Sequence, residues 1–310
     1  MISKGASRLL SRSFSTQATA TSFDPTKFIG KTYEEYQVDL NQRDMILYSL
    51  SIGFNEDPIN TNQFQFTYEH DKNFQIFPTM NVALALKRFP SFLQIPDFPA
   101  VDPFKILHGE EDLEVIKPLQ RDNSYIVSEK ILDIQDKEKF SSLVVEKSIS
   151  HKDTKEVHAK VISNFIMFGL SGYGYKGTYK APSFPKKPET PATQITLEKT
   201  HANQALLYRL NGDYNPIHID PAKANALKFD RPILHGLCTM GFSARSVYTA
   251  FANNDPLKVK KVVSRFTSTV FPGESLEVQM WKIQDTNTIY YETKVKERDV
   301  TALKGYMHLN

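Results

Sequence analysis

The chain has 310 residues, of which 40% are hydrophobic and 24% charged, so it is not a wholly disordered protein and has room for two domains. Its formal net charge is +3, but Lys4, Arg8 and Arg12 supply three positive charges before the first acid, Asp24. The remainder is neutral, which excludes a broad basic surface for nucleic acid. The single cysteine, Cys238, excludes a disulfide framework and any multi-cysteine metal site.

The N-terminal segment has the composition of a targeting signal. Residues 1–22 are rich in serine, carry arginine and contain no acid, which is typical of a mitochondrial presequence. We therefore predict that residues 1–23 form a presequence and that the protein is mitochondrial, with a peroxisomal location as the alternative. The last four residues are not a standard peroxisomal signal. No run of about 18 apolar residues occurs, so no membrane span is predicted.

The first half of the chain mixes helical and strand patterns. Residues 80–89 lie between two prolines and favour a short apolar helix. Residues 124–134 and 156–168 are rich in β-branched and aromatic side chains, which predicts strands. Apolar and small residues alternate from Val157 to Phe165, so one face of that strand should be buried.

A change of composition marks the middle of the chain. Four glycines in residues 169–177 are followed by four prolines in residues 182–191, a pattern typical of an interdomain connection. We predict an N-terminal domain over residues 24–185 and a C-terminal domain over residues 186–310. The glycines lack a preceding strand and a following helix in the needed register, which argues against a phosphate-binding loop.

The second half shows a clear order of elements. Residues 193–200 predict a strand, and residues 236–251 predict a helix that is apolar around nearly its whole circumference, as expected for a helix wrapped by a sheet. Residues 261–270, 275–283 and 288–297 alternate well and predict three further strands. One long helix with several antiparallel strands is an α+β layer.

Two internal matches indicate a duplication. Residues 109–115 (GEEDLEV) resemble residues 273–278 (GESLEV), with Val115 lying 163 positions before Val278. Residues 48–55 (YSLSIGFN) fall on YRLNGDYN at the slightly smaller offset of 160 positions. Repeats of this kind predict that both halves share one fold.

The stretch YRLNGDYNPIH, residues 208–218, holds an acid and a base five positions apart. The Asn-Pro pair within it favours extended or turn geometry, so Asp213 and His218 can face each other across a tight turn and hold one water. The alternative is a turn that caps a following helix, with His218 on the surface. At the 160-residue offset, Gly53 and Pro58 replace this acid and base, so the N-terminal half should be catalytically empty and its apolar interior free for a hydrocarbon chain.

Residues 208–220 and the later RPILHGLCTMGFSARSV, residues 231–247, resemble the signature of the eukaryotic hydratase 2 family, the (R)-specific 2-enoyl-CoA hydratases of the MaoC-like hot-dog group. The similarity extends over FPTMNVALALK, KILHGEEDLEV and GLSGYGYKG, and covers roughly residues 30–310. It implies a double hot dog, in which each repeat is an antiparallel sheet wrapped round a central helix, and an activity that adds water to trans-2-enoyl-CoA. Asn211 departs from the small hydroxyl residue usual in the family.

The candidate catalytic residues are Asp213, His218 and Gly236. Asp213 is assigned as the base that activates water, and the Gly236 N–H, at the start of the buried helix, as a donor to the thioester oxygen. The resemblance implies substrate contacts at His108, Gly109, Lys137, Tyr214, Asn215, Pro216, Ile217 and Phe266. No metal is predicted, because His218 and His235 are distant in sequence and lack a paired ligand at helical spacing.

The resemblance implies no cofactor beyond the CoA carried by an acyl-CoA substrate. Two alternatives stay open. The first is a 3-hydroxyacyl-[acyl carrier protein] dehydratase of mitochondrial fatty-acid synthesis, which would use the same acid and base. The second is an acyl-thioester-binding or thioesterase hot-dog protein. The sequence also leaves open whether the protein forms a homodimer.

Overall fold

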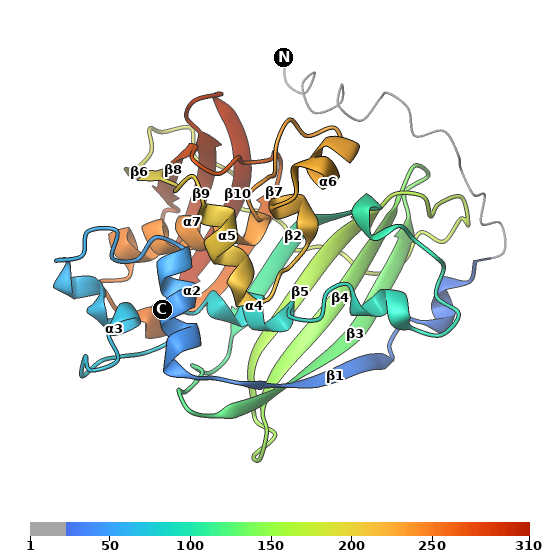
Figure 1. Ribbon diagram of the computed structural model, residues 1–310, viewed down its shortest axis with the longest axis horizontal. Helices are drawn as coiled ribbons and strands as arrows, with labels where there is room; N and C mark the ends of the chain where they lie inside the picture. The colour runs from blue at the N-terminus through green and yellow to red at the C-terminus, as the bar shows by residue number, and fades with distance from the viewer. Residues whose placement is uncertain (1–22) are drawn as a thin grey trace.

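The computed structural model describes residues 23–310, so all but the last residue of the predicted presequence lies outside the described residues (Figure 1). Its centre is one ten-stranded sheet in the order β1-β3-β4-β5-β2-β7-β10-β9-β8-β6. Every pairing in that sheet is antiparallel. Five strands come from each half of the chain, and β2 pairs with β7 at the junction. The predicted α+β double hot dog is therefore confirmed.

The elements of the N-terminal half are β1 (Thr32–Asp39), α2 (Gln42–Ser51), α3 (Phe64–Thr67), α4 (Met80–Ala85), β2 (Ile106–Val115), β3 (Ser124–Asp136), β4 (Ser141–His151) and β5 (Val157–Met167). Those of the C-terminal half are β6 (Gln194–Lys199), α5 (Gln204–Tyr208), α6 (Pro221–Ala226), α7 (Gly236–Phe251), β7 (Val259–Phe266), β8 (Ser275–Lys282), β9 (Thr288–Val295) and β10 (Val300–Leu309). None of the described helices is long and apolar enough to cross a membrane.

The two central helices differ in length. Helix α7 has the predicted bounds, and every residue from Leu237 to Tyr248 is buried, because strands β6 to β10 all pack around it. Helix α4 is also fully buried, against β4 and β5, but it ends at Ala85 and not at residue 89. Lys87 and Arg88 are exposed and Pro90 cannot continue a helix, so the buried segment stops one turn early.

The two halves repeat the same order of elements, but not at a constant offset. GEEDLEV lies in β2 at the centre of the sheet, whereas GESLEV leads into β8, which is equivalent to β3, so the alignment at 163 residues was wrong. The 160-residue offset holds around α2 and α5. The rings of Tyr48 and Tyr208 lie 6.4 Å apart, and Asn211 Nδ2 donates to Ser51 Oγ at 2.9 Å. Thus Asn211, the departure from the family pattern, is hydrogen-bonded to the other half.

The connection between the halves, residues 168–193, contains no helix or strand. Asp133 Oδ2 on β3 accepts hydrogen bonds from the backbone N–H groups of Thr178 and Tyr179, each at 2.7 Å. Further along, Lys187 Nζ contacts Glu292 on β9 at 2.7 Å. The connection is therefore attached first to one half and then to the other.

Candidate active site

A tight turn presents Asp213. It begins at Gly212, whose φ of +127° suits glycine and where a Cβ would lie 2.9 Å from Lys87 Cγ. Asp213 Oδ1 accepts from the N–H of Asn215 at 3.1 Å, and Asn215 Oδ1 accepts from the N–H of Ile217 at 3.2 Å. The second bond caps a short 3₁₀ helix over Pro216–His218. These local bonds leave the other carboxylate oxygen of Asp213 free to face the site.

His218 faces Asp213 across that turn. Its Nδ1 lies 2.8 Å from the carbonyl oxygen of Ile233, and a carbonyl only accepts, so Nδ1 carries the hydrogen. In the neutral imidazole Nε2 then has a free lone pair, and this atom lies 3.9 Å from Asp213 Oδ2. A water about 2.8 Å from both atoms would bridge them at an angle of about 90°. The predicted acid-base pair is therefore assembled with room for one water.

The electrostatics favour a neutral His218. Burial lowers the pKa of His218, while the Asp213 carboxylate and the Ile233 carbonyl oppose that shift. The side chain of Asp213 is 32% exposed and that of His218 only 10%, so the carboxylate lies nearer solvent. Near neutral pH both groups thus present an acceptor to a bound water.

His235 is a candidate positioning residue that the sequence reasoning used only to argue against a metal. Its ring stacks on that of His218, with centroids 3.6 Å apart, and its Nε2 donates to the backbone carbonyl of Asp213 at 3.2 Å. Burial, and then the neighbouring His218, hold the pKa of His235 well below its usual value. A neutral His235 therefore holds both candidate catalytic residues in place. Its place directly before the glycine that starts a buried helix was the available signal.

Gly236 is the first residue of α7, so its N–H has no partner within the helix and the helix dipole favours negative charge there. A Cβ at Gly236 would lie 3.1 Å from the ring of Phe266, which explains why glycine is needed for this approach. Phe266 in turn lies 5.1 Å, ring to ring, from His108 on β2. The site therefore extends from the C-terminal half to β2, the strand of the N-terminal half at the junction.

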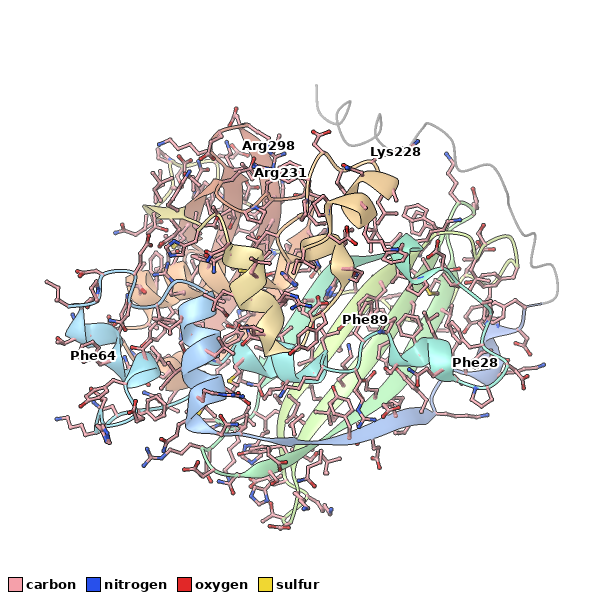
Figure 2. All side chains as sticks on the ribbon, in the orientation of Figure 1. Phe28, Phe64, Phe89, Lys228, Arg231 and Arg298 are labelled. Atoms are coloured by element: carbon pink, nitrogen blue, oxygen red, sulfur yellow. The ribbon has the colours of Figure 1, made fainter. Side chains whose placement is uncertain are left out.

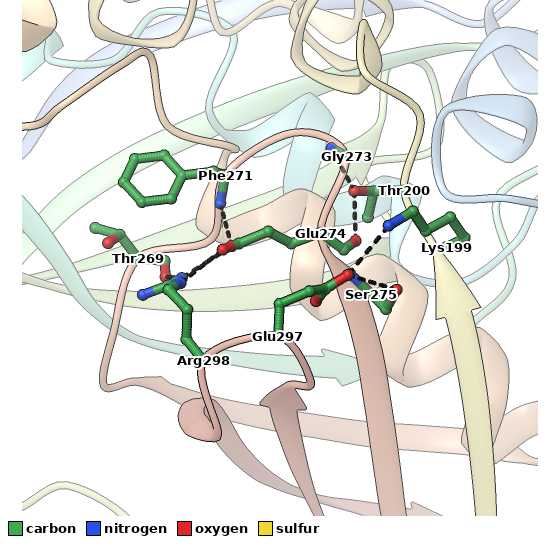
Figure 3. Close-up of polar contacts among 9 residues, drawn as sticks. All are labelled: Lys199, Thr200, Thr269, Phe271, Gly273, Glu274, Ser275, Glu297 and Arg298. Atoms are coloured by element: carbon green, nitrogen blue, oxygen red, sulfur yellow. Dashed lines mark hydrogen bonds and ion pairs between the residues drawn. The ribbon is translucent and has the colours of Figure 1, made fainter.

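The loop between β7 and β8 supports the segment before α7. The N–H of Leu234 donates to the carbonyl of Val270 at 2.8 Å. Next to it, Phe271 N–H donates to Glu274 Oε2 at 2.7 Å, and Arg298 also binds the Glu274 carboxylate (Figure 3). Because Glu274 is buried, these charge-assisted bonds should keep the loop, and through it the start of α7, in place.

Comparisons with known proteins show the family of the chain. Residues 38–169 match the family described as the MFE-2 hydratase 2 N-terminal domain, and residues 183–305 match the MaoC like domain. The chain is 33% identical to peroxisomal enoyl-CoA hydratase 2 of Arabidopsis thaliana, over 93% of this chain and 96% of that protein. The chain belongs to the MaoC-like hydratase 2 family.

Other members resemble it over different shares of their length. The mouse peroxisomal multifunctional enzyme type 2 is 35% identical over 91% of this chain, which corresponds to 38% of that longer protein. A crystal structure of a MaoC-like dehydratase from Phytophthora capsici superimposes with a TM-score of 0.84 at 32% identity, covering 93% of this chain and 98% of that one.

The contacts that the hydratase 2 resemblance implies fall into three places. The first place is the turn between Asp213 and His218, which we call the catalytic turn and which includes Asn215, Pro216 and Ile217. Tyr214, by contrast, is 56% exposed and lies under Arg209.

The second place is the junction, where the ring of His108 contacts that of Phe266. Gly109 lies at a bulge in β2, and a Cβ there would be a tight 3.3 Å from the Asn164 carbonyl oxygen. The third is Lys137, which is exposed in the turn between β3 and β4, neither of which pairs with β2. The substrate roles of all these residues stay predictions.

Asp213, His218 and His235 converge, with candidate ligand atoms all within 4.8 Å of one another. The two imidazole rings are stacked with an interplanar angle of only 24°, however, so their in-plane lone pairs run nearly side by side. A metal about 2.1 Å from a nitrogen of each ring would lie far out of both ring planes. The cluster therefore suits proton transfer better than metal binding.

Proposed function

We propose that this chain is an (R)-specific enoyl-CoA hydratase, a hydro-lyase that adds water reversibly to trans-2-enoyl-CoA and forms (3R)-3-hydroxyacyl-CoA. The observation that carries the proposal is the pair of acceptors, Asp213 Oδ2 and His218 Nε2, 3.9 Å apart, with His218 stacked on His235, the residue before the start of α7. Hydration of an enoyl thioester needs a base for water, a proton for C2 and a donor for the thioester oxygen. In the proposed mechanism the pair supplies the base, the bound water supplies the proton, and the Gly236 N–H is the donor.

The protonation states define the order of events. Both members of the pair start as acceptors, so neither holds a proton for C2. The base, assigned as Asp213, takes one proton from the bridging water while the water oxygen bonds to C3 of the substrate. The electrons of the C2–C3 double bond move toward the thioester oxygen, which Gly236 N–H stabilises. The same proton is then delivered to C2, so the elements of one water are added and the carboxylate is regenerated.

The assay follows the loss of enoyl absorbance with trans-2-enoyl-CoA, together with chiral analysis of the product. Addition of water and of the proton to one face should give the (3R) product. Release of free thiol without hydration would identify a thioesterase. A clear preference for matched acyl carrier protein substrates would identify the dehydratase of fatty-acid synthesis. Formation of (S) product would contradict the proposed mechanism.

For the location we propose the peroxisome. Both the Arabidopsis relative and the mouse relative carry the word peroxisomal in their names. The mitochondrial prediction rests on residues 1–22 alone, which are outside the described part of the chain. Organelle fractionation with N-terminal sequencing of the mature protein tests this. A shortened chain recovered from mitochondria would restore the mitochondrial prediction.

A further inference from the structure

The inner face of the N-terminal sheet carries a row of buried polar side chains. Glu129 on β3 lies directly opposite Lys147 on β4, and Ser163 on β5 lies directly opposite Glu111 on β2. Lys147 Nζ donates to Ser163 Oγ at 2.8 Å, and Ser163 Oγ donates to Glu111 Oε1 at 3.2 Å. Glu111 also contacts His108 Nε2 at 2.5 Å. We call Glu129, Lys147, Ser163 and Glu111 the polar row.

The polar row is buried deeply and is not fully satisfied. Glu111 is 0% exposed, and Glu129 and Lys147 are each 2% exposed. Burial lowers the pKa of Lys147, and the two carboxylates oppose that shift. Glu129 Oε2 accepts from Tyr33 and Ser91, but Glu129 Oε1 has no partner within the described residues. The interior of this half is therefore not the uniformly apolar space that the sequence suggested.

A line of packed residues connects the turn that carries Asp213 and His218 to the polar row, and an acyl chain that entered the N-terminal half would follow it. From Gly236, successive contacts lead to Phe266, to His108 and then to Phe165, whose ring is 4.9 Å from that of His108. Lys147 Nζ lies 5.2 Å from the centre of the same Phe165 ring.

Aromatic rings cover the other side of Phe165. The ring of Phe89 lies 4.7 Å from that of Phe165, and Figure 2 shows Phe89 in front of the strands of the N-terminal half. An extended chain that entered this half would have to displace these rings and press against the polar row.

This arrangement limits the acyl group. Apolar carbons placed against these buried charges offer no hydrogen bond to Glu129 Oε1, which lacks a partner among the described residues, and an apolar neighbour in place of a polar one is unfavourable for a buried charge. A four-carbon acyl group ends near the catalytic turn and does not meet this cost. We propose that the polar row makes this chain a hydratase of short-chain enoyl thioesters, an inference that rests on the hydratase function proposed above.

The test compares C4 and C10 trans-2-enoyl-CoA as substrates of the full chain. The wild type should show a kcat/KM at least about tenfold lower on C10, mostly through KM. The double variant Glu129→Met/Lys147→Met removes the opposed charges with unbranched side chains of similar length. This variant should raise the ratio of kcat/KM on C10 to kcat/KM on C4 about tenfold or more.

The neighbouring residue pair on β3 and β4 provides a matched control. Lys130 and Glu146 are also directly opposite and form an ion pair at 2.9 Å, but successive strand residues point to opposite faces, so this pair lies on the outer face. The variant Lys130→Met/Glu146→Met should keep the wild-type ratio.

Three results would overturn the inference. A wild type that uses C10 as well as C4 refutes it even if the double variant fails to fold. An unchanged ratio in a folded double variant refutes the role of the row. Preference for a C10 substrate with a terminal hydroxyl over C4 would show that the row recognises polar tails. Absence of hydration with every enoyl-CoA would instead remove the proposed function, and the inference with it.

Discussion

A change of either Asp213 or His218 should remove the activity that the two residues provide together. Asp213→Asn keeps an oxygen that can accept from the Asn215 N–H but puts an NH₂ donor where Oδ2 faces the water. His218→Gln removes the Nε2 lone pair. Because one water bridges a gap of 3.9 Å, losing either acceptor releases it. We expect each single change to lower kcat by about 10²- to 10⁴-fold, with acyl-CoA binding largely retained.

The double variant decides whether the water is shared. If each change costs about 10³-fold, independent action predicts a loss of about 10⁶-fold, whereas a shared water predicts about 10³-fold. The rate of enoyl absorbance loss measures this, and melting curves confirm folding. Asp220→Asn is the matched control, since Asp220 caps α6 through Ala222 N–H and asparagine caps equally well. Multiplicative losses, or near-normal turnover in a folded Asp213→Asn, would refute the reasoning.

Three further outcomes are expected. Gly236→Ala should lower kcat/KM about 10²-fold, because a Cβ 3.1 Å from the Phe266 ring displaces the N–H donor; an unchanged rate would remove Gly236 from the site. Ala83→Phe in the buried α4 should lower turnover on C10 more than on C4 enoyl-CoA, at a cost of about 1–3 kcal/mol in stability that a melting control reports, and equal losses would contradict an acyl route there. The pKa values of His218 and His235 lie below their usual 6.5, so the stability that depends on both being neutral is present above that value and is lost as the pH falls below it. The melting temperature should therefore fall between about pH 7 and about pH 5, and less so in His235→Gln.

The sequence predicted elements whose side chains share one environment. Helix α7 was predicted with its observed bounds because it is buried on all sides, so its apolar residues need no partner to be recognised. Strand β10 was missed although it lies inside the sheet, because Lys304, Gly305 and His308 interrupt its alternation. Strand β2 was noticed only as a motif. Its acids are buried because partners on another strand neutralise them, as Arg265 does for Glu110 at 2.7 Å, and no local pattern shows this.

The same distinction between local contacts and contacts distant in sequence applies to the candidate site. Asp213 and His218 could be paired from the sequence, since the Asn-Pro turn that joins them is local and its hydrogen bonds lie within five residues. His235, 22 residues after Asp213, acts through a backbone carbonyl and a stacked ring, and neither contact has a sequence signature.

The polar row also depends on contacts between residues that are distant in sequence. Glu129 and Lys147 become opposite only through the register of β3 and β4, which no local sequence pattern shows. The proposed acid-base pair is thus encoded locally, whereas the polar row proposed to select the substrate depends on strand register. A family resemblance can therefore identify the reaction while leaving the acyl chain undetermined.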